Sequence, residues 1–258
     1  MATTLNADEI LTDEMVDRYR ETGWLRIDRI ITDEELDWLR GVYDDFFDPE
    51  GPYAGKGARI KQLGGTDESG RKLSPQVLRP ADASEELRNS TYLARLEVLA
   101  KLLLGDDASF QRDHMIMKPA GYGTPTPWHQ DQAYGGGDRI VRNVNFWLPL
   151  EDATVENGCM HFVSGTHRSV IVPHRYLDPD DPQTALVATD QEYWSVNGTA
   201  VPIPAGTATA HHSYTMHYAT GNTTDRPRRA YIAVFGQSPL ERPTTWVLPW
   251  LDAARRGS

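Results

Sequence analysis

The feature that most limits the fold of this chain is a change of character after Gly105. Beyond it, short runs of β-branched and aromatic residues alternate with turn residues such as Gly121 and the glycines at 135–137. Many short strands separated by regular turns are typical of a β-sandwich or a β-barrel. We therefore predict a β-rich body over 106–240. Its predicted strands span 110–118, 143–150, 160–163, 170–172, 208–212 and 229–235.

The residues before this body have helical patterns. Thr12 is a suitable N-cap for a short helix over 12–22. Thr32 and Glu35 have the spacing of a capping box and precede apolar residues with a helical period. A third helix is predicted over 84–104. Its apolar stripe, predicted to pack in the core, consists of Leu93, Leu96, Val98, Leu99, Leu102 and Leu103.

The segment 48–80, between the second and third predicted helices, has no apolar period and is rich in Gly, Pro, Lys and Asp. We predict a long loop here. Such loops are uncommon in compact domains and often cover active sites, so the alternatives are a lid and a disordered segment. No repeat or interdomain linker is apparent. The prediction is one domain over 1–258, with a helical part (1–105), the β-rich body and a tail (241–258).

The composition excludes several classes of protein. A net charge of -11 and a pI near 5.2 argue against nucleic acid or an anionic membrane as a partner. The lone cysteine, Cys159, cannot form a disulfide within the chain and is predicted to lie in the core. No signal peptide and no apolar run long enough for a membrane span are apparent. These features predict a cytoplasmic protein.

His129 and Asp131 stand two positions apart, after a turn rich in Gly and Pro. On a β-strand, such residues face the same side, so the two side chains could hold one cation. Imidazole nitrogen and carboxylate oxygen suit Fe(II), Mn(II) or Zn(II), and a second histidine would complete a two-histidine, one-carboxylate centre. Spacing leaves the third ligand open. The candidates are His211, His212 and His217, with His161 and His167 nearer in sequence.

An iron centre of this type needs an electron-donating co-substrate. The usual one, 2-oxoglutarate, carries two carboxylates, and the carboxylate far from the metal needs a cation. Arginine has a planar fork that matches a carboxylate. Arg226, Arg228 and Arg229 lie where a predicted strand begins. Only one of Arg228 and Arg229 can point inward, because adjacent strand residues face opposite sides.

Several ordered motifs resemble the phytanoyl-CoA dioxygenase family of Fe(II)/2-oxoglutarate-dependent oxygenases. The resemblance extends over nearly the whole chain. The motifs lie at 11–14, 32–36, 118–119, 126–131, 147–154, 156–159 and 162–167, followed by His217, Asn222 and Arg228. The fold that the resemblance implies is mainly β with flanking helices, a double-stranded β-helix or jelly roll of the cupin type.

The resemblance also implies roles for individual residues. His129, Asp131 and His217 take the positions of the iron ligands, and Arg228 takes that of the arginine that binds the distal carboxylate. Many relatives have a serine two residues after the distal histidine, where this chain has Ala219. The expected co-substrate residues are Trp147, Thr126 and His114, with Thr220 or Thr126 replacing the serine hydroxyl. The expected substrate residues are Tyr134, Asn143 and Asn145.

The function implied by the resemblance is a dioxygenase that uses Fe(II), 2-oxoglutarate and O2. It would hydroxylate an unactivated C–H bond of a small metabolite or natural-product intermediate, with release of succinate and CO2. Asp131 argues against halogenation, because halogenating relatives carry a small residue at this position. The same centre could instead desaturate, epimerise, epoxidise or close a ring. An alternative of another class is a non-catalytic metal- or ligand-binding jelly-roll protein. The chain is expected to be a monomer or homodimer.

Overall fold

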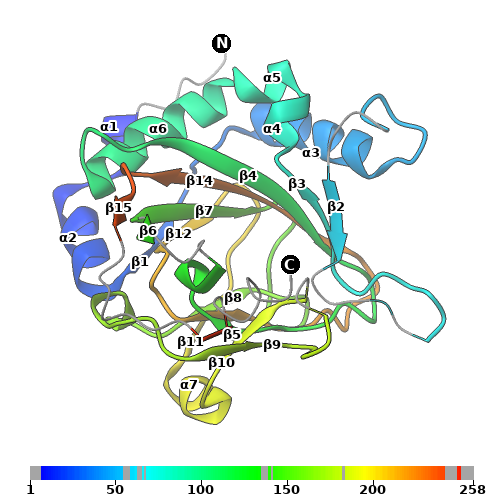
Figure 1. The fold of residues 1–258 in the computed structure, drawn as a ribbon. Helices are drawn as coiled ribbons and strands as arrows, with labels where there is room; N and C mark the ends of the chain where they lie inside the picture. Colours follow the sequence, from blue (N-terminus) through cyan, green and yellow to red (C-terminus); the bar gives the residue numbers. More distant parts are fainter. Residues whose placement is uncertain are drawn as a thin grey trace.

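The computed structural model describes residues 7–54, 59–62, 66, 68–134, 139–140, 142–181, 184–241 and 249–250. Within these ranges, two antiparallel sheets face each other, and helices from the first part of the chain cover the outer face of the larger sheet (Figure 1). The predicted turn at 135–137 and most of the predicted tail at 241–258 lie outside the described residues.

The larger sheet has seven strands. Their spatial order is β1 (Trp24–Ile27), β12 (Ala208–His212), β7 (Asn143–Pro149), β14 (Arg228–Gly236), β4 (Ser109–Lys118), β3 (Pro75–Leu78) and β2 (Arg59–Gln62). The strands predicted at 110–118, 143–150, 208–212 and 229–235 are confirmed as β4, β7, β12 and β14 with shifts of one residue at most.

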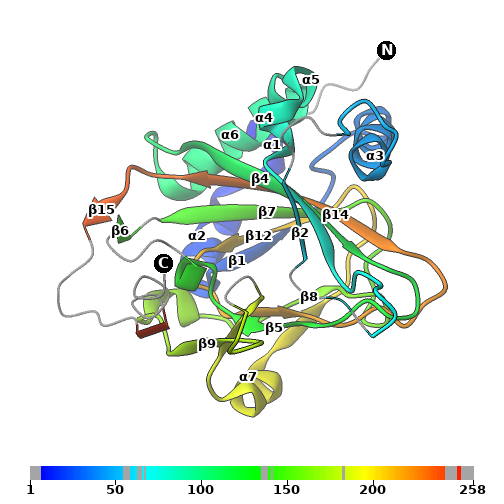
Figure 2. The same ribbon diagram turned by 45° about the vertical axis from the view of Figure 1, so that its right-hand side comes forward.

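The smaller sheet has four strands, and it lies below the larger sheet in the view of Figure 2. Their order is β11 (Thr199–Val201), β8 (Met160–Phe162), β13 (His217–Ala219) and β5 (Thr126–His129). Two further pairs are β9 (His174–Tyr176) with β10 (Leu186–Ala188), and β6 (Arg139–Ile140) with β15 (Leu240–Glu241).

The chain passes repeatedly from one sheet to the other. In chain order, β4, β7, β12 and β14 of the larger sheet alternate with β5, the β8 and β11 pair, and β13 of the smaller one. This alternation between two facing antiparallel sheets is that of a jelly roll. The predicted fold class, mainly β with flanking helices, is therefore confirmed.

The helices are α1 (Ala7–Ile10), α2 (Asp13–Thr22), α3 (Asp33–Phe47), α4 (Pro80–Ala83), α5 (Glu85–Arg88), α6 (Thr91–Leu104) and α7 (Gln191–Asn197), with 3-10 turns η1 (Asp131–Tyr134) and η2 (Thr166–Arg168). Both predicted threonine caps are confirmed. Thr12 accepts a hydrogen bond from a backbone N–H of α2, and Thr32 forms the full capping box with Glu35. None of the described helices is long and apolar enough to cross a lipid bilayer.

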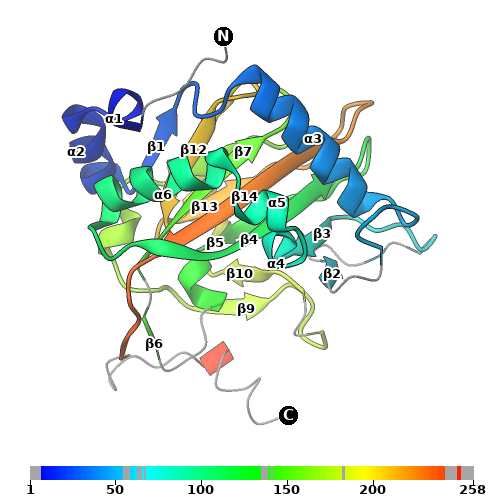
Figure 3. The same ribbon diagram turned by 90° about the horizontal axis from the view of Figure 1, so that it is seen from above.

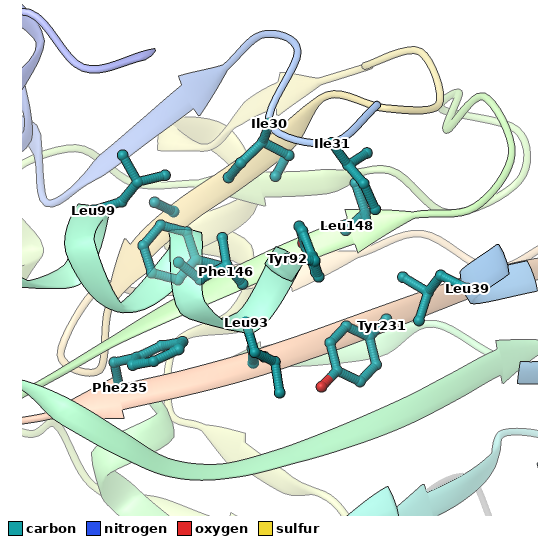
Figure 4. Packing of buried hydrophobic residues seen from close by; sticks show 14 of the residues in the cluster. Ile30, Ile31, Leu39, Tyr92, Leu93, Leu99, Phe146, Leu148, Tyr231 and Phe235 are labelled. Carbon is teal, nitrogen blue, oxygen red and sulfur yellow. The ribbon is translucent and has the colours of Figure 1, made fainter. Parts of the chain in front are cut away.

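Helices α3 and α6 lie across the outer face of the larger sheet (Figure 3). Figure 4 shows Tyr92 and Leu99 of α6 in the same cluster as Phe146 and Tyr231 of the sheet, and all four have 0% exposure. Because strand residues alternate, their neighbours on β7 and β14 face the smaller sheet, where Trp147 belongs to a second apolar cluster. The outer face of the larger sheet therefore forms the main core, and its inner face is left for the site.

The prediction of one helix over 84–104 is wrong. The structure has two helices, α5 and α6, because two serines each begin a helix. Ser84 Oγ accepts from Leu87 N and Ser90 Oγ accepts from Leu93 N, both at 3.2 Å. The predicted apolar stripe is also too wide, since Val98 is 43% and Leu102 39% exposed. The members of the stripe that are buried are Leu93, Leu96, Leu99 and Leu103.

The prediction of one long loop over 48–80 is wrong in its second half. Strands β2 and β3 pair with each other, and Gln76 of β3 lies opposite Ile116 of β4, so this segment extends the larger sheet. Strands of four residues, one beginning with a proline, are too short to show a period in the sequence. Residues 55–58, 63–65 and 67 lie outside the described part, and a lid role for the segment stays a prediction.

The strand predicted over 170–172 is absent. Val170 is 62% exposed, and the backbone N–H of Val172 donates to the side chain of Gln130 at 2.9 Å instead of joining a sheet. The next strand, β9, begins only at His174. The predicted core position of Cys159 is confirmed, since its exposure is 0%.

Two leucines of α6 provide a matched test of this packing. Leu99→Ala removes a side chain with 0% exposure and should lower the free energy of unfolding by about 2–5 kcal/mol, because a cavity remains. Leu102→Ala, on the exposed side of the same helix, should change it by about 0.5 kcal/mol or less. Urea unfolding followed by circular dichroism measures both. Equal losses would contradict the placement of α6.

Candidate metal centre

The pairing of β5 with β13 brings two histidines together. His217 lies directly opposite His129 in this antiparallel pair, so the two side chains leave the sheet on the same face. Their ring centroids are 4.1 Å apart, and the residues are 6% and 4% exposed. Of the histidines left open by spacing, His217 is therefore the one that the fold places opposite His129.

Asp131 does not lie on the same strand as His129, contrary to the expectation of a strand with two alternate ligands. Strand β5 ends at His129, and Asp131 is the first residue of η1. The change from strand to 3-10 turn still directs the carboxylate towards the histidines. Asp131 Oδ1 lies 3.5 Å from His129 Nε2 and 3.6 Å from His217 Nε2.

The backbone orients both imidazoles. His129 Nδ1 lies 2.7 Å from the carbonyl oxygen of Pro127, and His217 Nδ1 lies 2.9 Å from that of Thr215. A carbonyl accepts a hydrogen bond, so each Nδ1 carries the proton and each Nε2 keeps a lone pair directed at the shared space. This arrangement of the second nitrogen is the usual one for histidine ligands of metals.

Electrostatics keeps Asp131 and His217 in the protonation states that a metal requires. Burial opposes the ionisation of Asp131, but the histidines around it, His217 first, hold the pKa of its carboxyl well below the usual range. Burial lowers the pKa of His217 well below its usual value, so its imidazole is neutral. Candidate ligand atoms of His129, Asp131 and His217 all lie within 4.8 Å of one another. Imidazole nitrogens from two histidines and a carboxylate oxygen fit a divalent cation such as Fe(II).

Gln130, between the two ligands, holds this turn in place. Its Nε2 donates to the carbonyl oxygen of Tyr214 at 2.8 Å, and its Oε1 accepts from Val172 N at 2.9 Å. Its backbone N–H donates to His174 Nε2 at 3.2 Å. From the tail, Trp250 Nε1 donates to the carbonyl oxygen of Ala133 in η1 at 3.1 Å. Contacts from three other parts of the chain, the segment 172–174, Tyr214 and Trp250, thus fix the ligand-bearing turn.

His211 is a site residue that the sequence analysis did not select. Its Nε2 lies 3.3 Å from Asp131 Oδ2, the carboxylate oxygen not shared with the other histidines, and its ring centroid lies 4.5 Å from that of His217. It belongs to β12 and faces inward, opposite Asn145 of β7. Its inward parity was visible only once the strand β12 and its register were known.

Arg228 and Arg229 face opposite sides, as the strand pattern predicts. Arg229 points outward and pairs with Glu151, its Nε lying 2.7 Å from Oε1, and with Asp44 of α3. Arg228 points inward, is 1% exposed, and its guanidinium lies 5.2 Å from the ring of Trp147. Its Nε and Nη1 have no hydrogen-bond partner within the described ranges. Burial lowers the pKa of Arg228 to about 10, so it stays charged at neutral pH.

A buried cation without an acidic partner is costly unless a ligand supplies the anion. The cluster that contains Trp147 also includes Ala230, two residues from Arg228, and Ala219, two residues from His217. The guanidinium thus lies on the inner face of the larger sheet, across from the strand that carries His217. Its position suits the distal carboxylate of 2-oxoglutarate.

The other expected co-substrate residues have different surroundings. Thr126 lies opposite Ala219 in the β5–β13 pair, and its hydroxyl accepts a hydrogen bond from Lys118 Nζ at 3.3 Å. His114 is opposite Ile232 on the inner face, and burial lowers its pKa to about 4. Thr220 lies beyond the end of β13, and its hydroxyl donates to the carbonyl oxygen of Val155 at 2.6 Å. The structure therefore brings Thr126 into the group and leaves Thr220 outside it.

The expected substrate residues lie on two sides of the centre. The ring of Tyr134 meets that of His129 edge-on with centroids 5.7 Å apart, and its hydroxyl accepts from Leu186 N at 2.8 Å. Asn143 and Asn145 are 5% and 3% exposed and share the inward parity of Trp147 on β7. Asn143 Oδ1 and Asn145 Nδ2 have no hydrogen-bond partner among the described residues.

Comparisons with known proteins find relatives that match most of this chain. L-proline trans-4-hydroxylase of Streptomyces griseoviridis is 26% identical over 237 residues, which cover 85% of this chain and 84% of that protein. Phytanoyl-CoA dioxygenase domain-containing protein 1 of Danio rerio is 24% identical over 278 residues, covering 93% and 95%. The crystal structure of EvdO2 from Micromonospora carbonacea var. aurantiaca, complexed with 2-oxoglutarate, shares 32% identity at a TM-score of 0.80 and covers 94% of this chain and 97% of that one.

The family model described as phytanoyl-CoA dioxygenase (PhyH) matches residues 19–230. This match includes the three candidate metal ligands, Arg228 and every strand of the two sheets except most of β14, and it extends over most of the chain. The resemblance found in the sequence motifs is thereby confirmed. The chain belongs to the phytanoyl-CoA dioxygenase family.

Proposed function

We propose that this protein is an Fe(II)- and 2-oxoglutarate-dependent dioxygenase that acts on a small molecule. The observation that carries the proposal is the buried guanidinium of Arg228 on the inner face of the larger sheet, whose Nε and Nη1 have no hydrogen-bond partner in the described part of the chain. Three metal-binding side chains alone would also suit a structural metal. A buried cation to which a carboxylate could bind favours a centre that binds 2-oxoglutarate.

In this proposal His129, Asp131 and His217 hold Fe(II), and Arg228, with Trp147, Thr126 and His114, surrounds the co-substrate. When bound, iron and 2-oxoglutarate supply the oxidising chemistry, in which O2 and 2-oxoglutarate give succinate and CO2 and the second oxygen atom passes to the substrate. The protein contributes binding and orientation. His211 would hold the second oxygen of Asp131, which keeps the first directed at the metal.

For the reaction outcome we propose hydroxylation of an unactivated C–H bond. The support is the similarity to a proline hydroxylase and the presence of Asp131 as a third ligand. Tyr134, Asn143 and Asn145 are the proposed substrate contacts. Tyr134 lies near His129, and the two asparagines face inward with side-chain atoms that have no hydrogen-bond partner among the residues the structure describes. Incubation with candidate substrates, followed by mass spectrometry and succinate measurement, separates hydroxylation from desaturation, epimerisation, epoxidation and ring closure. Absence of any 2-oxoglutarate consumption would favour a non-catalytic metal-binding protein.

Variants of His217, Asp131 and His161 test the metal assignment. His217→Ala removes a proposed ligand and should weaken Mn(II) binding by about 100-fold or more, since even indirect contacts to a metal contribute 10–100-fold. Asp131→Ala should have the same effect and abolish turnover. His161, opposite Tyr218 in the β8–β13 pair, is the control, and His161→Ala should keep the Mn(II) affinity. Isothermal titration with Mn(II) measures all three variants. Full O2-dependent turnover by Asp131→Ala would refute the assignment.

The co-substrate assignment is tested with two adjacent arginines. Arg228→Met keeps the bulk of the side chain and removes the charge, so the KM for 2-oxoglutarate should rise by about 10–100-fold because a charge-assisted pair is lost. Arg229→Met removes the outward arginine and should leave this KM unchanged. Succinate formation at varied 2-oxoglutarate concentration gives both values. An equal KM for the two variants would show that Arg228 does not bind the co-substrate.

A further inference from the structure

Arg112 of β4 is a cation on the inner face of the larger sheet that the proposed iron chemistry does not use. It lies opposite Val234 of β14, a member of the apolar cluster on that face. The arginine is partly buried. No hydrogen bond or ion pair joins it to another of the described residues. Withdrawing a guanidinium from water without an acidic partner costs free energy, so this position suits a ligand that brings a negative charge.

A β-bulge directs Arg112 inward. Phe110 and Arg112 are two residues apart, so in a regular strand both would face the same side. Here Phe235 of β14 pairs with Phe110, whereas the residue before it pairs with Arg112, and Gln111 is the extra residue. Phe110 packs edge-on against Phe235 in the outer core, with ring centroids 5.5 Å apart. The bulge therefore lets one strand send the phenylalanine outward and the arginine inward.

Arg112 ends a row of residues that crosses the inner face and begins beside the candidate metal centre. Members of the row lie directly opposite one another on adjacent strands. From β12 to β4 they are His211, Asn145, Val234 and Arg112. With adjacent strands about 4.8 Å apart, the backbones of His211 and Arg112 are about 14 Å apart. Because His211 contacts Asp131, the row joins the metal centre to the guanidinium.

Polar atoms along this row lack partners. Asn145 Nδ2 and His211 Nδ1 are buried and have no hydrogen-bond partner within the described ranges. Val234, between Asn145 and Arg112, has a short side chain, so a ligand over it could reach the guanidinium on one side and the amide on the other. Both groups offer N–H donors. They therefore suit a group that only accepts hydrogen bonds, such as a carboxylate.

Metal binding would leave Arg112 without a counter-charge. Burial lowers the pKa of Arg112 below its usual value, and the negative charge of Asp131 opposes this effect. Asp131 is a proposed metal ligand, so a bound cation would neutralise that charge. Arg79 adds repulsion, and its own acidic partner is Asp82 at 3.4 Å. An anionic group on the substrate would supply the charge that Arg112 then lacks.

Arg112 is separate from the proposed co-substrate arginine. Its partner Val234 lies six residues along β14 from Arg228. At about 3.4 Å per residue, about 20 Å of strand separates these two positions. A co-substrate bound at Arg228 therefore leaves Arg112 available for a second ligand.

We propose that the substrate is a carboxylic acid and that Arg112, together with Asn145, binds its carboxylate. The proposal rests on the proposed function and names the substrate class for that site. The single charge and planar fork of a guanidinium match a carboxylate. A phosphate monoester carries nearly two negative charges and would need a second cation, which the row does not provide. Since Arg112 and the metal centre lie at opposite ends of the row, the reacting carbon lies away from the carboxylate.

Trifluoroacetate is the probe for this site, and trifluoroacetamide is its neutral counterpart. The protein is loaded with Mn(II) and saturating 2-oxoglutarate without O2, so the co-substrate site is filled. Mn(II) accelerates the fluorine relaxation of a ligand bound nearby, and its concentration dependence gives a Kd. Arg112→Met should raise the Kd of trifluoroacetate by about tenfold or more, because a charge-assisted pair is lost. Trifluoroacetamide should show little relaxation with either protein.

Two other arginine variants are controls. Arg112→Lys keeps the charge without the planar fork and should retain part of the affinity. Arg88→Met removes an exposed arginine whose guanidinium lies 4.2 Å from the ring of Phe110, on the outer side of β4. It should bind trifluoroacetate as the unmodified protein does. The affinity for 2-oxoglutarate should stay within about twofold in all three variants.

Stability separates a binding role of Arg112 from a structural one. Arg112→Met removes a cation without a partner, so the urea midpoint should be equal to or higher than that of the unmodified protein. Asn145→Leu removes the second donor at similar size and should also weaken trifluoroacetate. This variant keeps the test decisive if Arg112→Met does not fold, which circular dichroism would show.

The outcomes distinguish this inference from the proposed function. Equal trifluoroacetate relaxation in the unmodified protein and Arg112→Met, or none in the unmodified protein, would overturn the carboxylate site. Loss of 2-oxoglutarate binding in Arg112→Met would assign the arginine to the co-substrate and also overturn it. Failure of the unmodified, Mn(II)-loaded protein to bind 2-oxoglutarate would instead refute the proposed function.

Discussion

The antiparallel pairing of β5 with β13 is the constraint on which the site depends. It places His129 and His217 opposite each other, so two imidazoles that are far apart in the sequence converge. The third ligand, Asp131, is the first residue of the 3-10 turn η1, which follows β5. Gln130 and Trp250 hold that turn from outside. A register shift of one residue in this short pair would send one histidine to the opposite face.

The two faces of the larger sheet carry different kinds of side chain. The outer face carries apolar side chains that pack under α3 and α6, and this contact supplies most of the buried apolar area. The inner face carries polar and charged residues that are rarely buried in an apolar core, namely Lys118, His211, Asn145 and Arg228. The helices therefore allow the sheet to keep polar and charged groups buried on the side where the chemistry takes place.

Local patterns in the sequence predicted local structure well. The capped helices α2 and α3 and the long strands β4, β7, β12 and β14 were identified because propensity and period act over a few neighbouring residues. Strands β5 and β13 were not, because segments of four and three residues, one of them containing Pro127, show no period. The helix break at Ser90 was hidden because a serine is compatible with both a cap and a helix interior.

For the site too, the residues that were predicted from spacing are those close together in the sequence. His129 and Asp131 are close in sequence and were recognised from their spacing, whereas His217 and Arg228 required the family motifs. His211 was only one of several candidate ligands and Lys118 was assigned no role, because their positions depend on which residues stand opposite them in the β12–β7 and β14–β4 pairs. Burial of a charge next to another charge is a property of the assembled sheets, and no single segment encodes it.

The pairing of β5 with β13 also determines when the site can form. One strand ends at His129 and the other begins at His217, so almost the entire jelly roll separates them in the chain. Both strands must have left the ribosome before the ligands can meet. Contacts between residues that are far apart in the sequence also form slowly. The growing chain therefore carries His129 and Asp131 as an incomplete set of ligands while residues 132–217 are being added. The three ligands come together only when β13 pairs with β5.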